Sequence, residues 1–112
     1  MLTTTIVLFI VAALLGLAVA RQILSKKPTA KGVVIAHGAF GAAGLIALIF
    51  HAASNPHRLL TTAIILLVVA ALGGLIVFVN DLRGKVGPLG LIVVHALVAA
   101  AAVALVLVVA IK

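Results

Sequence analysis

Four long apolar runs are the feature that most constrains how this chain can fold. They cover Leu2–Ala20, Val33–Ala53, Leu59–Val79 and Leu89–Ile111. Each has about 19 to 23 residues, enough for a helix to cross roughly 30 Å of hydrocarbon. None alternates apolar and polar residues as the strands of a membrane barrel do. The sequence therefore predicts an all-α membrane protein, an up-down bundle of four transmembrane helices that forms one domain over residues 1–112.

The basic residues divide unevenly between the two ends of this bundle. Six of them lie in the loops 20–32 and 80–88, and only Arg58 and Lys112 lie at the opposite end. The six are Arg21, Lys26, Lys27, Lys31, Arg83 and Lys85. Loops rich in Lys and Arg stay in the cytoplasm, so both loops are predicted to be cytoplasmic and both termini outside, in a membrane of the bacterial inner-membrane type. The net charge of +7 does not indicate nucleic-acid binding, because the cations lie in short loops.

The second half of the chain repeats the first half at an offset of 58 residues, without a gap. The matched pairs include Thr3-Thr4 with Thr61-Thr62, Gly16 with Gly74, Lys27 with Lys85 and His37 with His95. Such self-similarity indicates a tandemly duplicated helical hairpin, with one repeat over residues 1–54 and the other over 59–112. Because each repeat has two helices, both insert with the same orientation, related by a pseudo-two-fold axis along the membrane normal.

One histidine of each repeat, His37 or His95, lies within an apolar segment about six residues from a basic loop. An ionisable side chain at that depth is costly and indicates function. The repeat places both at one depth on either side of the pseudo-axis, as two axial ligands of a six-coordinate iron require. We therefore predict that His37 and His95 are the metal ligands of one haem b. A backbone carbonyl or a water is expected at the other ring nitrogen, because no Ser or Thr lies at that depth.

Two glycines lie at about the same depth on the helices that carry no predicted ligand. Gly16 and Gly74 have no side chain, so a flat macrocycle edge would be able to approach the backbone there. The alternative is that they are small residues at helix–helix contacts. We predict a cofactor-binding role for both.

Three further positions near the histidines are candidate cofactor contacts. Lys31 and Lys85 (or Arg83) lie at the cytoplasmic end, where cations would bind haem propionates. Topology alone also accounts for basic residues there. Phe40, one turn after His37, is a candidate to pack on the porphyrin, although phenylalanine in a bundle is more often a core residue.

The spacing of two histidines on one helix resembles that of a known family. His51 follows His37 by 14 residues, about 40° short of four full turns, and therefore shares its face. The four-helix architecture and this spacing resemble the transmembrane b-type cytochromes of the cytochrome b and cytochrome b561 kind. The resemblance implies that His37 and His95 are axial ligands. It does not extend to a second bis-histidine haem, because the repeat equivalent of His51 is Val109.

The remaining polar residues leave several roles open. His51, with Asn55 and His57, is an interfacial group, a vestigial or five-coordinate site, or a proton or quinone contact. Asp81 is the only side-chain carboxylate and is predicted to pair locally with Arg83 or Lys85. No carboxylate lies within the apolar runs, which excludes small multidrug transporters and carboxylate-based proton relays.

These features together predict a small cytochrome that transfers one electron at a time in or across the bilayer, to a redox partner or a quinone. Two histidine ligands leave no open iron position, which favours electron transfer over oxygen chemistry. One alternative is an accessory haem-binding subunit without redox turnover. Another is a structural scaffold in which His37 and His95 hydrogen-bond across the bundle. Association into homo-oligomers is open.

Overall fold

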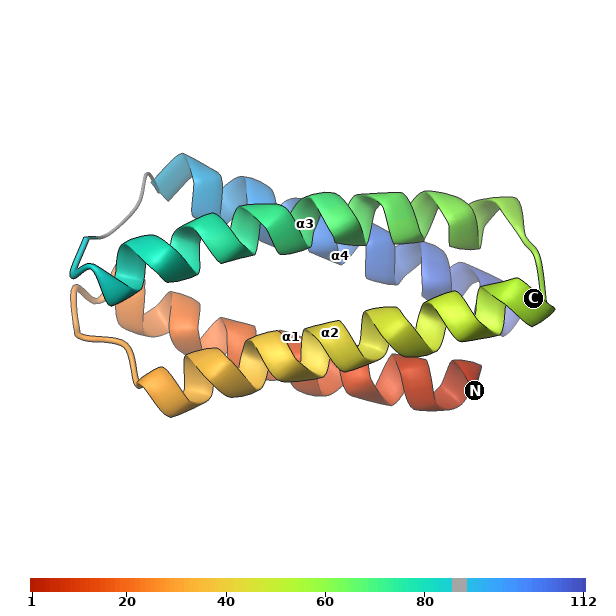
Figure 1. The fold of residues 1–112 in the computed structure, drawn as a ribbon, viewed down its shortest axis with the longest axis horizontal. Coiled ribbons are helices and arrows are strands. Elements are labelled where there is room, and N and C mark those ends of the chain that lie inside the picture. The colour runs from red at the N-terminus through yellow and green to blue at the C-terminus, as the bar shows by residue number, and fades with distance from the viewer. Residues whose placement is uncertain (86–88) are drawn as a thin grey trace.

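The computed structural model describes residues 1–85 and 89–112, so residues 86–88 of the predicted 80–88 loop lie outside the described residues. The described chain forms four α-helices and no strand. They are α1 (Leu2–Leu24), α2 (Lys31–Ser54), α3 (Arg58–Leu82) and α4 (Leu89–Ile111). The helices run up and down in a bundle of 42 × 22 × 19 Å, with both termini at the end opposite the α1–α2 loop (Figure 1). The predicted four-helix bundle is confirmed.

All four helices are long and apolar enough to cross a membrane. Many large apolar side chains point outward, as they do on a surface that faces lipid rather than water. The protein is therefore an integral membrane protein. At the basic end, three helices extend beyond the apolar runs, since α1 ends at Leu24, α2 begins at Lys31 and α3 ends at Leu82.

Both hairpins leave their first helix through the same backbone motif. Lys26 and Gly84 have positive φ angles of 55° and 71°. The next amide, of Lys27 or Lys85, donates to a carbonyl five residues earlier at 3.0 and 2.9 Å. This is the Schellman arrangement, which satisfies carbonyls that a helix end leaves unpaired. The two motifs occupy equivalent positions of the repeat.

The two hairpins are the closely packed units of the bundle. Helix α1 packs along α2 and α3 packs along α4, and the hairpins meet through narrower α2–α3 and α1–α4 contacts. Helices α2 and α4 therefore face each other diagonally. Figure 1 shows the two hairpins as separate layers that approach each other most closely at their ends.

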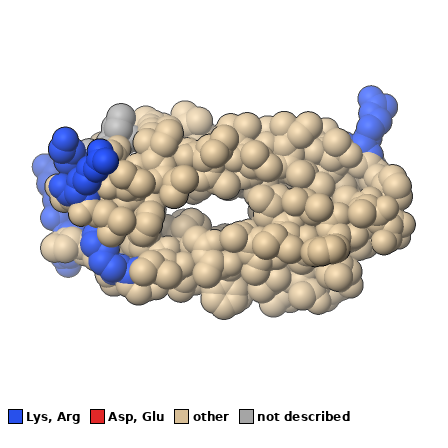
Figure 2. All heavy atoms as spheres, viewed as in Figure 1, with Lys and Arg blue, Asp and Glu red and all other residues tan. Residues whose placement is uncertain are grey.

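The core occupies the half of the bundle nearer the termini. Its buried helical residues, apart from Leu60, fall at positions related by the 58-residue offset. They are Thr5, Phe9 and Ala12 with Ala63, Leu67 and Ala70, and Gly44 and Leu48 with Ala102 and Val106. In the other half, no described helical residue is buried. The space-filling view shows an opening that passes through the molecule near its middle (Figure 2).

Candidate functional site

The structure brings His37 and His95 together across the diagonal of the bundle. The two ring centroids lie 6.2 Å apart, and the ring planes are nearly perpendicular, at 83°. Both imidazoles are half-buried. The two helices that carry them do not pack on each other directly, so the rings meet in the space between the hairpins.

Each imidazole is held by a backbone carbonyl of its own hairpin. His37 Nδ1 lies 2.7 Å from the Ala12 carbonyl oxygen, and His95 Nδ1 lies 2.7 Å from that of Ala70. A carbonyl oxygen can only accept, so Nδ1 carries the proton and donates. The predicted carbonyl partner is therefore confirmed in both repeats. In this tautomer Nε2 is the ring nitrogen that carries the lone pair.

Gly16 and Gly74 lie against these imidazoles. A Cβ atom on Gly16 would be 2.8 Å from Cε1 and 3.1 Å from Nδ1 of His37. A Cβ atom on Gly74 would be 2.8 and 3.2 Å from the same atoms of His95. The neighbour of each glycine is thus the imidazole, whereas the sequence analysis considered a macrocycle edge or a helix–helix contact. Contact with a macrocycle stays a prediction.

The Nε2 atoms border accessible space. Among the described residues, neither Nε2 has a hydrogen-bond partner, and no buried side-chain nitrogen or oxygen lacks one. Each Nε2 atom is therefore not fully enclosed by protein. The described residues hold no group of three or more His, Asp or Glu side chains arranged around one point.

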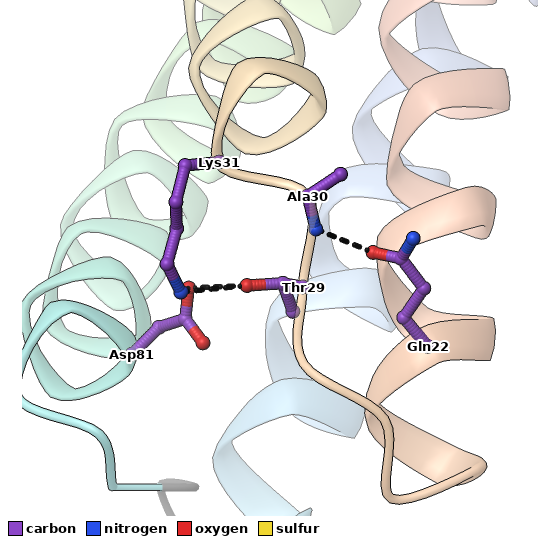
Figure 3. A network of polar contacts seen from close by, with 5 residues as sticks. All are labelled: Gln22, Thr29, Ala30, Lys31 and Asp81. Carbon is purple, nitrogen blue, oxygen red and sulfur yellow. Dashed lines mark hydrogen bonds and ion pairs between the residues drawn. The ribbon is translucent and has the colours of Figure 1, made fainter.

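Asp81 binds a residue of the other hairpin, so the predicted local pairing with Arg83 or Lys85 is wrong. Lys31 Nζ lies 2.6 Å from Asp81 Oδ2, and Thr29 Oγ1 donates to the same oxygen at 2.7 Å (Figure 3). Lys31 also donates to Thr29 Oγ1 at 2.8 Å. Asp81 is at the end of α3 and Lys31 at the start of α2, so the tertiary packing joins them across the hairpin boundary.

A second hydrogen bond orders the α1–α2 loop beside this ion pair. The backbone amide of Ala30 donates to Gln22 Oε1 at 2.9 Å (Figure 3). The loop that precedes Lys31 is therefore fixed to the end of α1. The ammonium of Lys31, a predicted propionate ligand, is already engaged by a carboxylate of the chain itself.

The other candidate cofactor contacts lie at the surface. Lys85 is exposed and lies three residues after the end of α3. The side chain of Phe40 is 37% exposed and lines a shallow depression together with Leu8, Ala39 and Ala43. Contact of either residue with a cofactor is still a prediction.

The backbone carbonyl of His51 and the imidazole of His57 both accept hydrogen bonds near the opposite end. Asn55 donates from its backbone and its side chain to the His51 carbonyl, at 2.9 and 3.2 Å. His57 is the N-cap of α3, where its Nδ1 accepts from the Leu59 amide at 3.0 Å. The sequence reasoning missed this cap. Its position directly before Arg58, at a helix start, was the available signal, but histidine is not among the favoured capping residues.

Comparisons of the chain with protein-family models, curated proteins and solved structures found no match. The function is therefore inferred from the residues themselves.

Proposed function

We propose that this protein is a small membrane cytochrome of the b type, in which His37 and His95 bind one haem b through Nε2. The imidazole pair carries the proposal. Two imidazoles that bind one metal through bonds of about 2.0 Å each would have ring centroids roughly 6 Å apart. The separation in the protein is 6.2 Å.

The protonation of the two rings supports the same proposal. Each Nδ1 donates to a carbonyl, so each Nε2 is the nitrogen that can bind a metal. A hydrogen bond from the remote nitrogen also orients the ring and raises its basicity toward the metal. The opening between the hairpins is consistent with a flat group lying between two rings (Figure 2).

The surroundings of the pair favour electron transfer. A haem bound by two histidines supplies a one-electron couple at iron. The chain orients both imidazoles and surrounds them with apolar helices that exclude water. The only side-chain carboxylate, that of Asp81, lies too far along the helices to take part in acid–base chemistry at the pair. His37 lies six residues, or about 9 Å of helical rise, from Lys31 at the basic end. We propose exchange with a partner at that end or with a quinone in the bilayer.

The orientation in the membrane belongs to the same proposal. Six of the eight cations lie at the end that holds the α1–α2 loop, and Figure 2 shows most of the visible Lys and Arg side chains at that end. By the positive-inside rule, this end faces the cytoplasm of a bacterial-type inner membrane and both termini face outside.

One observation favours the alternative, a scaffold or accessory subunit without redox turnover. Each imidazole already has a hydrogen-bond partner in its own hairpin, which accounts for a buried histidine without any ligand. Of the described residues, no pair of imidazoles is joined by a hydrogen bond, so the version with a bond across the bundle has no support.

A reduced-minus-oxidised absorption spectrum of the detergent-purified protein tests the proposal. We expect sharp low-spin bands that His37→Ala and His95→Ala each abolish or convert to high-spin bands. His51→Ala serves as the matched control, because His51 lies on the same helix as His37 but outside the pair, and it should retain the bands. A colourless protein after expression with ample haem contradicts the cytochrome and favours the scaffold.

A further inference from the structure

Each histidine-binding carbonyl is followed four residues later by a glycine. Gly16 follows Ala12, and Gly74 follows Ala70. In an α-helix the Cα–Cβ bond tilts toward the N-terminus, so a side chain at i+4 points back over the carbonyl at i. Any residue other than glycine would therefore cover the oxygen that each imidazole binds.

The distances from a Cβ atom at Gly16 or Gly74 to the imidazole show that there is no room for a side chain at either position. A Cβ atom at 2.8 Å from Cε1 is closer than nonbonded carbon atoms approach, and it would also crowd Nδ1. The imidazole cannot move away from the added Cβ atom and keep its hydrogen bond, because Nδ1 is bound to the carbonyl at 2.7 Å. A methyl group at either glycine would thus displace the ring from its acceptor.

We infer that Gly16 and Gly74 are positioning residues that hold His37 and His95 as the Nδ1–H tautomer and thereby select Nε2 as the metal-binding nitrogen. The effect on tautomer stands on the apo-protein geometry alone. The effect on a bound metal rests on the proposed function. The motif of a carbonyl, a glycine four residues on and a histidine 25 residues after the carbonyl occurs in both repeats.

The inference predicts a spectroscopic signature without any cofactor. In apo-protein labelled with ¹⁵N-histidine, NMR should show two of the four histidines locked as the Nδ1–H tautomer. His51→Gln and His57→Gln identify the other two by loss of their signals. Wild-type signals for His37 and His95 in the Nε2–H form, or in a mixture of the two tautomers, overturn the inference whatever the variants do.

Single glycine variants then show which glycine holds the tautomer of which histidine. Gly16→Ala should release His37 from the Nδ1–H form and leave His95 unchanged, and Gly74→Ala should do the reverse. Gly73→Ala is the matched control for Gly74→Ala, because its Cβ would meet only a Leu91 methyl group at 3.9 Å. Gly41→Ala is a second control, because its Cβ would meet nothing within 4 Å. If Gly74→Ala and Gly73→Ala give the same tautomer signals, the inference is wrong.

The second measurement is the midpoint potential of the haem-loaded protein. A hydrogen bond from Nδ1 makes an imidazole a stronger donor and favours the oxidised metal. Gly16→Ala should therefore shift the potential upward, whereas Gly73→Ala should not. A protein that shows the locked tautomers but binds no haem refutes the proposed function and leaves the positioning role intact. Haem binding with a midpoint potential that Gly16→Ala leaves unchanged overturns the inferred effect of Gly16 on the bound metal.

Discussion

Single residues show how the two repeats reach the same packing with different side chains. Phe9 lies against Gly44, where a Cβ atom would be 2.7 Å from the ring. The equivalent positions of the second repeat hold Leu67 and Ala102, both buried. A large residue facing glycine in one hairpin thus corresponds to a smaller residue and alanine in the other, so the total volume is roughly conserved.

This exchange predicts a compensating pair of substitutions. Gly44→Ala should destabilise the protein by about 1–3 kcal/mol, because the added methyl group overlaps the Phe9 ring. Phe9→Leu should also destabilise it, by leaving a cavity. The double variant recreates the pair of the second repeat and should recover most of the loss. Denaturant unfolding in detergent measures it, and a double variant no more stable than Gly44→Ala refutes the compensation.

A second residue-scale difference concerns the helix ends. Lys26 and Gly84 both have positive φ, but only glycine adopts that region without steric cost. Lys26→Gly should therefore stabilise the protein by about 1 kcal/mol, and Gly84→Ala should destabilise it by a similar amount. Lys26→Ala separates loss of charge from backbone relief and should give little gain. If Lys26→Gly and Lys26→Ala are equally stable, the positive φ of Lys26 does not strain the backbone.

At the scale of helices, the ion pair between Lys31 and Asp81 ties α2 to α3 at the basic end. It has no counterpart at the other junction, since the repeat equivalents of Lys31 and Asp81 are Leu89 and Ile23. The connection between hairpins is thus one-sided, although the hairpins themselves are alike.

A double-mutant cycle tests the ion pair. The side chains of Lys31 and Asp81 are 48% and 22% exposed, so solvent screening limits their coupling to about 1 kcal/mol or less. Lys31→Met and Asp81→Asn should show measurable positive coupling in unfolding experiments. Lys85→Met with Asp81→Asn is the control and should be additive. Coupling in the control but not in the first pair would support the local pairing instead.

For the whole molecule, orientation in the membrane is directly measurable because the chain contains no cysteine. Lys27→Cys marks the basic end and Asn55→Cys the opposite end. In intact spheroplasts, a membrane-impermeant maleimide should label Asn55→Cys, and Lys27→Cys only after permeabilisation. The cysteine-free parent protein gives the background. The reverse pattern of labelling contradicts the proposed orientation.

The whole bundle also combines a packed half with an open one. Buried side chains cluster near the termini, where Leu48, Leu60 and Val106 are fully enclosed. Figure 2 shows an opening near the middle of the molecule, and the two imidazoles lie on the loop side of the core residues of their own helices. The folded hairpins are thus joined firmly at one end and leave room between them in the middle.

Hydropathy and spacing along the chain were sufficient to predict the four spans, the charged end and the repeat. Apolar length governs whether a helix crosses a bilayer, and this property is local. The common depth of His37 and His95 also follows, because equal offsets along parallel helices give equal depths. A carbonyl partner for each imidazole was one of two predicted alternatives, the other being water, because no Ser or Thr lies at that depth.

Contacts between helices depended on how each helix is rotated about its axis and where it crosses its neighbours. Hydropathy does not encode these quantities, so the partner of Asp81 was predicted wrongly, and the imidazole against each glycine was not foreseen. The positive φ of Lys26 was also not predictable from the sequence, because lysine has no preference for that conformation. The membrane spans therefore follow from the free energy of transferring each apolar segment from water into the bilayer. The site, in contrast, depends on how the two hairpins pack against each other.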